Sequence, residues 1–337
     1  MSEKRIGEQT VKLKNPPKII STYSIVGPKE GEGPLCNYFD EILSDDTYGQ
    51  DSYEKSECEM MITAIKGAIH KANLSQEDIN YLFSGDLLNQ IITSGYAARE
   101  FNIPYFGLYG ACSTMAESLS LASLIMDGGY ADYVVASTSS HFSTAERQFR
   151  FPLEYGSQSH ETAQWTVTGS GAMVLGREGN YPEVKYVTTG MVKDYGITDP
   201  NNMGAAMAPA AVDTIYKHLK DTGRSPDYYD YIITGDLGKV GSEITDKLLL
   251  EYGYDISSNH VDCGVLIFDC ENQKVNSGGS GCGCSAVTAS GYFYKKLMNK
   301  EINKILLVST GALMSPTTNF QGESIPGIAH GVAIEMN

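Results

Sequence analysis

The chain has 337 residues, too many for one ordinary core, and its 42% apolar content is typical of a packed globular protein. Its net charge of -16 argues against binding to nucleic acid and against unaided binding to an anionic membrane surface. We expect no signal peptide, no transmembrane segment and seven reduced cysteines. No cysteine pair has the usual spacing of a zinc site, so we expect no metal and no other cofactor.

In chain order, the sequence predicts alternating strands and helices. Residues 1–16 are charged and are expected to form a loose lead-in. The predicted strands and helices then follow one another, the strands at residues 18–26, 79–84, 105–108 and 133–137 and the helices at residues 57–72, 88–101 and 112–126. This alternation predicts an α/β fold with a mostly parallel sheet.

Cys112 lies where a predicted strand passes through a tight turn into a helix. Residues 110–117 read Gly-Ala-Cys-Ser-Thr-Met-Ala-Glu, and Thr114 and Glu117 have the spacing of a capping box. Backbone N–H groups at such a helix start bind anions and lower the pKa of a thiol. Cys112 is therefore either a candidate nucleophile or a small buried residue, as free cysteines often are.

The second half of the sequence repeats the first. Tyr-Leu-Phe-Ser-Gly-Asp-Leu at 81–87 recurs as Tyr-Ile-Ile-Thr-Gly-Asp-Leu at 231–237, and Cys112-Ser113 recurs as Cys284-Ser285. Each cysteine is followed by a predicted helix and then a strand at equal spacing. We interpret the chain as a duplicated α/β unit whose two helix starts converge on one site. The predicted halves are residues 17–190 and 191–337.

These halves resemble the thiolase superfamily. The cysteine at a helix start carries the resemblance together with three glycine-rich segments, at residues 169–175, 276–286 and 327–335. The resemblance implies a thiolase-like fold, with two βαβαβαββ halves in a layered α-β-α-β-α arrangement. It also implies a histidine in the second half, but the corresponding turns, residues 234–238 and 280–284, contain none. An ionised aspartate such as Asp236 cannot donate to a thioester oxygen, so Cys112 is interpreted as a vestigial nucleophile position.

The same combination resembles the stage V sporulation protein AD family. The match is carried by residues 105–114, by residues 141–156 and by residues 278–285. It implies a binding protein rather than an enzyme, which takes up dipicolinic acid (pyridine-2,6-dicarboxylic acid), alone or as its calcium chelate, into the developing spore. It also implies a peripheral place at the spore inner membrane beside the other SpoVA proteins. A homodimer is expected from the superfamily.

Residues 137–165 form an island of cationic and amide side chains in this acidic chain. The island also holds Gln148 and Trp165. Two carboxylates on a flat ring need forked donors and a ring face, which arginine and an aromatic residue supply. We therefore expect the ligand-binding residues to come from this island, from both helix starts and from the last strand: Cys112, Ser113, His141, Arg147, Arg150, Gln158, His160, Cys284 and His330.

Simpler interpretations exist for most of these residues. Arg147 and Arg150 would equally pair with neighbouring glutamates or with a partner subunit, and His160 with Glu161. Trp165 suits the core as well as a stacking platform, and His330 is as easily structural as pocket lining. Three further histidines are expected at the surface, His70, His218 and His260, and four cysteines in structural positions, Cys36, Cys58, Cys263 and Cys270.

Three functions stay open from sequence. The first is a dipicolinate-binding protein on a retired condensing-enzyme scaffold. The second is an active acyl-CoA enzyme with Cys112 as nucleophile and His141 or His330 as base. The third is a structural subunit that only docks membrane partners. The missing second-half histidine favours the first function over the second, and the cationic island beside a helix start favours it over the third.

Overall fold

The computed structural model describes residues 3–149 and 160–336. Within them, twelve strands join into one sheet made of two five-stranded halves with one added strand each. The first half has the order β5-β4-β6-β8-β2 and the second the order β11-β10-β13-β14-β9. The first-half strands are β2 (Lys18–Val26), β4 (Tyr81–Gly85), β5 (Tyr105–Gly107), β6 (Val134–Ser140) and β8 (Gly169–Gly176). The second-half strands are β9 (Glu183–Thr188), β10 (Tyr231–Thr234), β11 (His260–Asp262), β13 (Lys304–Ala312) and β14 (Gly327–Glu335).

Both halves have the same topology. Numbered along the chain, the strands of each half stand in the order third, second, fourth, fifth and first. In each half the first two pairings in this order are parallel and the last two antiparallel. The predicted duplicated α/β fold is therefore confirmed, but the sheet is mixed rather than mostly parallel.

The two half-sheets join through their first strands. β2 and β9 are in register at one pair of residues, Lys18 and Glu183. The added strands are β3 (Glu41–Ile42) beside β2 and β1 (Thr10–Lys12) beside β9. β9 lies within the predicted first half, residues 17–190, yet it pairs with β14 and β1 in the second half of the sheet. The residue boundaries of the halves stay a prediction.

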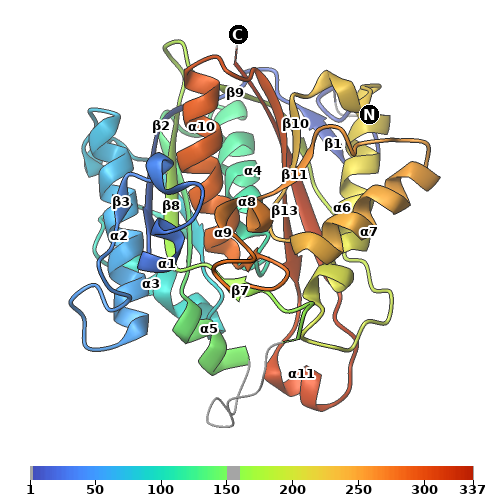
Figure 1. Ribbon diagram of the computed structural model, residues 1–337. Helices are drawn as coiled ribbons and strands as arrows, with labels where there is room; N and C mark the ends of the chain where they lie inside the picture. The colour runs from blue at the N-terminus through green and yellow to red at the C-terminus, as the bar shows by residue number, and fades with distance from the viewer. Residues whose placement is uncertain (1–2, 150–159, 337) are drawn as a thin grey trace.

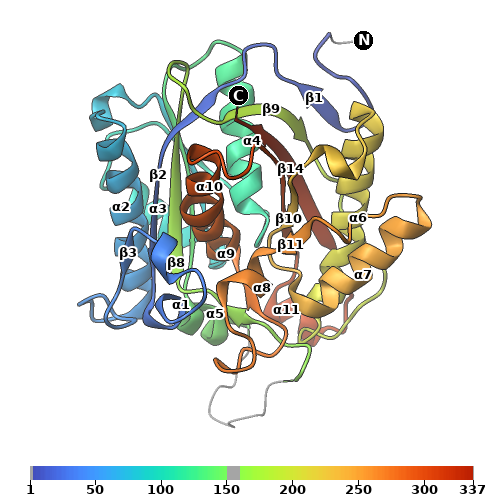
Figure 2. The same cartoon turned by 45° about the horizontal axis from the view of Figure 1, so that its top comes forward.

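Helices form three layers around the two half-sheets, as Figures 1 and 2 show. α2 (Tyr53–Lys71) and α3 (Ile92–Ala98) cover the outer face of the first half. α6 (Met203–Thr222), with α7 (Gly238–Glu251) against it, covers the second. The layer between the half-sheets is made of α4 (Thr114–Asp127), α9 (Cys282–Val287), the π-helical turn η6 (Thr288–Phe293) and α10 (Tyr294–Met298). The expected α-β-α-β-α layering is thus present.

The helix α4 is buried on nearly all sides because it lies in this middle layer. Met115, Ala116, Leu119, Ala122 and Met126 are fully buried, and such an all-round apolar helix belongs inside a protein. Shorter elements complete the described chain: α1 (Pro28–Gly31), α5 (Phe142–Phe149), α8 (Cys263–Ile267), α11 (Pro316–Phe320), β7 (Trp165–Thr166), β12 (Gly279–Ser280), and 3₁₀ turns at Cys36–Tyr38, Gln76–Asp78, Asn89–Ile91 and Pro226–Tyr228. No helix of the described chain combines the length and apolar character needed to span a membrane.

The N-terminal segment is not the loose lead-in expected for residues 1–16. β1 pairs with β9, and the Asp221 carboxylate accepts hydrogen bonds from the backbone N–H groups of Glu8, Gln9 and Thr10 at 3.0–3.1 Å. A carboxylate at the end of α6 therefore fixes the start of the chain.

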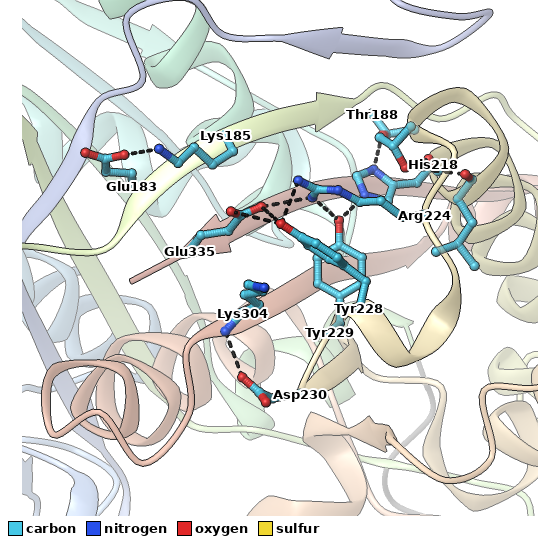
Figure 3. A network of polar contacts seen from close by, with 12 residues as sticks. Glu183, Lys185, Thr188, His218, Arg224, Tyr228, Tyr229, Asp230, Lys304 and Glu335 are labelled. Atoms are coloured by element: carbon cyan, nitrogen blue, oxygen red, sulfur yellow. Dashed lines mark hydrogen bonds and ion pairs between the residues drawn. The ribbon is translucent and has the colours of Figure 1, made fainter. Parts of the chain in front are cut away.

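A polar network links α6 and the residues after it to the strands β9 and β14 (Figure 3). Arg224 forms an ion pair with Glu335 at 2.9 Å and donates to the hydroxyls of Tyr229 and Tyr228 at 2.7 and 3.0 Å. His218 joins the Tyr229 hydroxyl at 2.6 Å to the Thr188 hydroxyl at 2.8 Å. The expectation that His218 lies at the surface is wrong: it is fully buried, and burial lowers its pKa to about 3.

Candidate functional site

The turn that presents Cys112 is held by hydrogen bonds of its own neighbours. Ala111 takes a left-handed φ of 50°, which bends the chain sharply before the helix. Thr114 Oγ1 accepts from Gly110 N at 3.1 Å and donates to Ala111 O at 2.6 Å, and Ser113 Oγ donates to Gly110 O at 2.7 Å. The predicted capping box is absent: Ser113 occupies the N-cap position, and its side chain caps no backbone N–H group.

Cys112 lies at the base of a narrow cavity of about 540 Å³, counted to its open mouth. The interior has room for only a few water-sized groups at once. Its walls are mainly apolar and come from both halves of the chain. The lining residues are Leu87, Tyr109, Ala111, Cys112, Ala145, Glu146, Phe149, Thr166, Pro200, Met203, Ser280, Ala312 and Met314.

The floor of the cavity is supplied by the second half. Ser280, at the end of β12, lies with its Oγ 4.0 Å from Cys112 Sγ and donates to Asp236 Oδ2 at 3.1 Å. Asp236 follows β10 and is 1% exposed. Its carboxylate also accepts from Gly281 N at 3.0 Å and from Thr310 Oγ1 at 2.7 Å. The two halves therefore meet in one site, as the repeat predicts.

Burial sets the protonation of both central groups. It raises the pKa of Asp236 to about 7, against the hydrogen bonds from Thr310 and Cys112, which lower it. Burial, with the nearby Asp236 carboxylate, raises the pKa of the Cys112 thiol well above its ordinary value. The helix start thus fails to make Cys112 a thiolate, because loss of water outweighs the helix dipole here.

The backbone N–H groups at both helix starts are already covered. A Cβ atom on Gly311 of β13 would lie 3.0 Å from Ser113 N and 3.2 Å from Cys112 N. The strand β13 therefore packs directly against the start of α4. At α9, Gly281 N is bonded to Asp236 and Gly283 N to Ser140 Oγ at 3.1 Å. The chain itself occupies the places where an anion was expected.

The second cysteine of the repeat is displaced from the helix start. α9 begins at Cys282, so Cys284 is its third residue, fully buried and not among the residues that line the cavity. Cys282 donates through Sγ to Ser139 O at 2.9 Å. Cys112 and the Ser280-Gly281 turn, rather than Cys112 and Cys284, face one another.

His141 directly precedes α5 and is not among the residues that line the cavity. It is 1% exposed. Its Nδ1 accepts from Ser143 N at 3.1 Å and its Nε2 lies 2.8 Å from Asp46 O. Burial lowers the pKa of His141, which favours the neutral ring. Both ring nitrogens are therefore occupied by the backbone.

The other predicted ligand residues are scattered. Arg147 pairs with Glu54 of α2, and His160 is exposed. His330 lies in β14, accepts from Gly190 N at 3.3 Å and does not line the cavity. Arg150 and Gln158 lie outside the described residues. Of the predicted set, the structure places Cys112 on the cavity and Ser113 directly behind it.

The structure also shows where Trp165 and two of the histidines expected at the surface lie. The Trp165 ring stacks on Phe142 at 3.6 Å between centroids, with Lys29 Nζ 4.1 Å from its centre, so the ring is occupied by its own neighbours. His260 has a 3% exposed side chain that binds Asp246 at 2.6 Å, so its expected surface position is wrong. His70 is exposed as expected.

Sequence reasoning missed Ser280, Thr310 and the bonding of Asp236. One signal was available: Gly-Asp ends the same strand in both halves, at residues 85–86 and 235–236. The first of these carboxylates is also buried, and Asp86 accepts from Leu88 N, Ser94 N and Ser94 Oγ at 2.7–2.8 Å. The repeated Gly-Asp pair thus marks a buried carboxylate in each half: Asp86 holds the loop after its own strand, whereas Asp236 holds Ser280, Gly281 and Thr310.

Comparison with known proteins agrees with this architecture. A family model described as "Stage V sporulation protein AD (SpoVAD)" matches residues 7–335. The stage V sporulation protein AD of Bacillus subtilis (strain 168) is 47% identical over 332 residues, which cover 98% of each chain.

Solved structures similar to this chain share its fold at low identity. 3-Oxoacyl-[acyl-carrier-protein] synthase III from Aquifex aeolicus VF5 has a TM-score of 0.57 and 14% identity over 95% of this chain and 99% of its own. A variant of OleA from Xanthomonas campestris has a TM-score of 0.63 and 13% identity over 95% of this chain and 98% of its own. The fold is therefore thiolase-like.

Proposed function

The chain belongs to the stage V sporulation protein AD family, and from this premise we propose that it binds dipicolinic acid for uptake into the developing spore. Its family makes it a sporulation protein on a thiolase-like fold. One observation carries the step to binding: the cavity keeps a buried cysteine, but a carboxylate and hydroxyls stand near it and no histidine is among the described lining residues. Such a site holds a ligand without reacting with it.

The walls suit a flat ring. Tyr109 and Phe149 bring aromatic side chains to the cavity, and Thr166 brings a hydroxyl that can donate to a ligand carboxylate. Because the cavity is narrow, a ring enters only when a wall side chain moves. Met203 and Met314 are suited to this, since methionine repacks at little cost.

Charge favours the calcium chelate over the free dianion. None of the described residues that line the cavity is a lysine, arginine or histidine, while Glu146 lines it and Asp236 lies beneath. A dianion is repelled by these carboxylates, whereas its one-to-one calcium chelate is neutral. Arg150 lies outside the described residues, and we propose it for the forked contact to a ligand carboxylate from the sequence alone.

Calorimetric titration of the full chain with dipicolinate, with and without calcium, tests this function. We expect binding in a one-to-one ratio, tighter with calcium, and none with isophthalate, which lacks the ring nitrogen. Arg150→Ala should weaken binding by about 10- to 100-fold, the cost of a lost charge-assisted hydrogen bond. Arg147→Ala is the matched control, because Arg147 pairs with Glu54. Equal effects of the two variants, or no heat from the wild-type chain, would overturn the proposal.

An acyl-CoA enzyme is the second candidate, because the structural neighbours include 3-oxoacyl synthase III and Cys112 is retained at the helix start. We propose a non-catalytic protein instead, since the described lining holds no histidine to act as base. Mass spectrometry after incubation with acetyl-CoA separates the two: an acetyl adduct on Cys112 or released CoA would restore the enzyme.

For location and partners, we propose peripheral attachment to the spore inner membrane through the other SpoVA proteins, in a homodimer that binds no nucleic acid. The described chain has no membrane-spanning helix and an acidic balance, which supports attachment through proteins rather than lipid. Flotation with spore membranes should require those partners, and light scattering of the purified chain reports the dimer.

A further inference from the structure

A line of three side chains runs from the cavity into the protein at Cys112. Ser280 Oγ has one proton, which it donates to Asp236 Oδ2 at 3.1 Å. The lone pairs of the same oxygen are left to face Cys112 Sγ, 4.0 Å away. The Cys112 thiol therefore lies beside both the Ser280 hydroxyl and the Asp236 carboxylate, with which it shares a side-chain hydrogen bond.

Asp236 cannot leave this position. Its two oxygens hold Ser280, Thr310 and Gly281, and the side chain is 1% exposed. In the part of the chain that the structure describes, no lysine, arginine or histidine forms an ion pair with it. The titratable groups close enough to interact electrostatically with it are Asp262, Cys112, Cys263, Cys282 and Cys284. When Asp236 is ionised, which the pKa of about 7 places in the neutral-to-alkaline range, its negative charge is balanced by hydrogen bonds alone.

We propose that the negative charge of Asp236, held beside Cys112, keeps the Cys112 thiol protonated, so that the cavity binds its ligand without forming a covalent bond to it. A second negative charge on sulfur beside a buried carboxylate is disfavoured by repulsion in a medium of low dielectric constant. The cysteine is thus retained in the sequence, but its surroundings keep its thiol unreactive. The biological use of this device rests on the proposed function, but the chemistry of the thiol does not.

The charge can be removed with little change of shape by Asp236→Asn. The amide oxygen still accepts from Ser280 and Gly281, while the amide nitrogen donates to Thr310 Oγ1, whose hydroxyl rotates to accept. Thr310→Val is the matched control, since it removes one hydrogen bond to Asp236 and leaves the charge in place. Ser280→Ala separates the hydroxyl from the carboxylate in the same way.

The test is the rate of Cys112 alkylation by iodoacetamide in the folded full chain, read by peptide mass spectrometry from about pH 6 to pH 10. The thiolate displaces iodide, and the thiol proton goes to solvent. We expect Asp236→Asn to raise the rate at neutral pH at least tenfold and to shift the profile to lower pH, with Thr310→Val and Ser280→Ala close to wild type. Buried Cys263 and Cys284 should stay unlabelled in every variant, which excludes general opening of the fold.

The wild-type chain alone also tests the proposal, should the asparagine variant fold poorly. Its folded Cys112 should react along a profile displaced to higher pH than the same cysteine in the urea-unfolded chain. Coincident folded and unfolded profiles would overturn the proposal, as would equal rates for wild type and Asp236→Asn. Neither result depends on dipicolinate. The alkylation experiment therefore still tests the role of Asp236 if the calorimetric titration shows no binding.

Discussion

At the scale of single residues, Gly311 shows why the Cys112 turn has so little freedom. An added Cβ would lie 2.3 Å from Gly110 O, well inside van der Waals contact. The atoms it would meet are backbone atoms of the turn, which cannot rotate away. Glycine is required here by the close approach of β13 to the turn, since its own φ is not left-handed.

Gly311→Ala should therefore destabilise the chain by about 1–3 kcal/mol, the cost of overpacking, and displace Cys112. Urea unfolding followed by circular dichroism measures the loss. Gly95→Ala in α3 is the control, because its Cβ would meet nothing within 4 Å. There we expect no loss, or a gain of up to about 1 kcal/mol from helix propensity. Equal stability of the two variants would contradict the close packing of the turn.

At the scale of elements, the Arg224 network joins parts of the chain that are distant in sequence. Arg224, just after α6, reaches Glu335 in β14, and His218 in α6 reaches Thr188 in β9. Thr188 is in turn 3.0 Å from the hydroxyl of Thr10 in β1. Because the ion pair is mostly buried, its partners depend on each other.

Arg224→Met should cost about 2–4 kcal/mol of unfolding free energy, since Glu335 and two tyrosine hydroxyls lose their donor. Thermal unfolding checks this value. The exposed pair of Lys247 and Glu243, 3.9 Å apart on α7, gives the control: Lys247→Met should change stability by less than about 0.5 kcal/mol. A small effect at Arg224 would mean that the tyrosines and water replace its contacts.

The same elements show which features of the fold and the site could be predicted from the sequence and which could not. The Gly-Asp repeat and the cysteine at a helix start predict the duplicated fold, because topology follows local patterns that recur. The partners of Asp236 come from β12, α9 and β13, and no local pattern encodes such long-range contacts. His218 was misplaced for the same reason: its helix gives no sign that Tyr229 and Thr188 enclose it.

At the scale of the whole molecule, buried acids lower the stability of the fold as pH rises, and buried histidines lower it as pH falls. Burial raises the pKa of Glu30 and Glu57 to about 8 each, so the folded chain keeps protons that the unfolded chain releases as pH rises from about 5 to 8. Burial lowers the pKa of His218 to about 3 and His330 to about 4, so the unfolded chain gains protons first as pH falls below about 6.5. The two ranges overlap between about pH 5 and 6.5, where the two effects oppose each other, so stability should be highest there.

Glu57→Gln should flatten the alkaline side of this curve. Between about pH 5.5 and pH 7.5 the unfolding free energy of wild type should fall by about 2–3 kcal/mol more than that of the variant, the work of one retained proton. Urea titrations at both pH values measure the difference. Glu243→Gln, on the exposed face of α7, should leave the wild-type slope unchanged. Parallel curves for wild type and Glu57→Gln would show that Glu57 is ionised in the folded chain.

The division of the cavity between the two halves has a consequence for synthesis. Cys112 is made 168 residues before Ser280, which forms the floor beside it. At about 5–20 residues per second, roughly 8–34 seconds pass between the two. For that time the nascent chain lacks the complete set of residues that enclose Cys112 in the folded protein, so its thiol is more open to reagents while the chain is still attached to the ribosome.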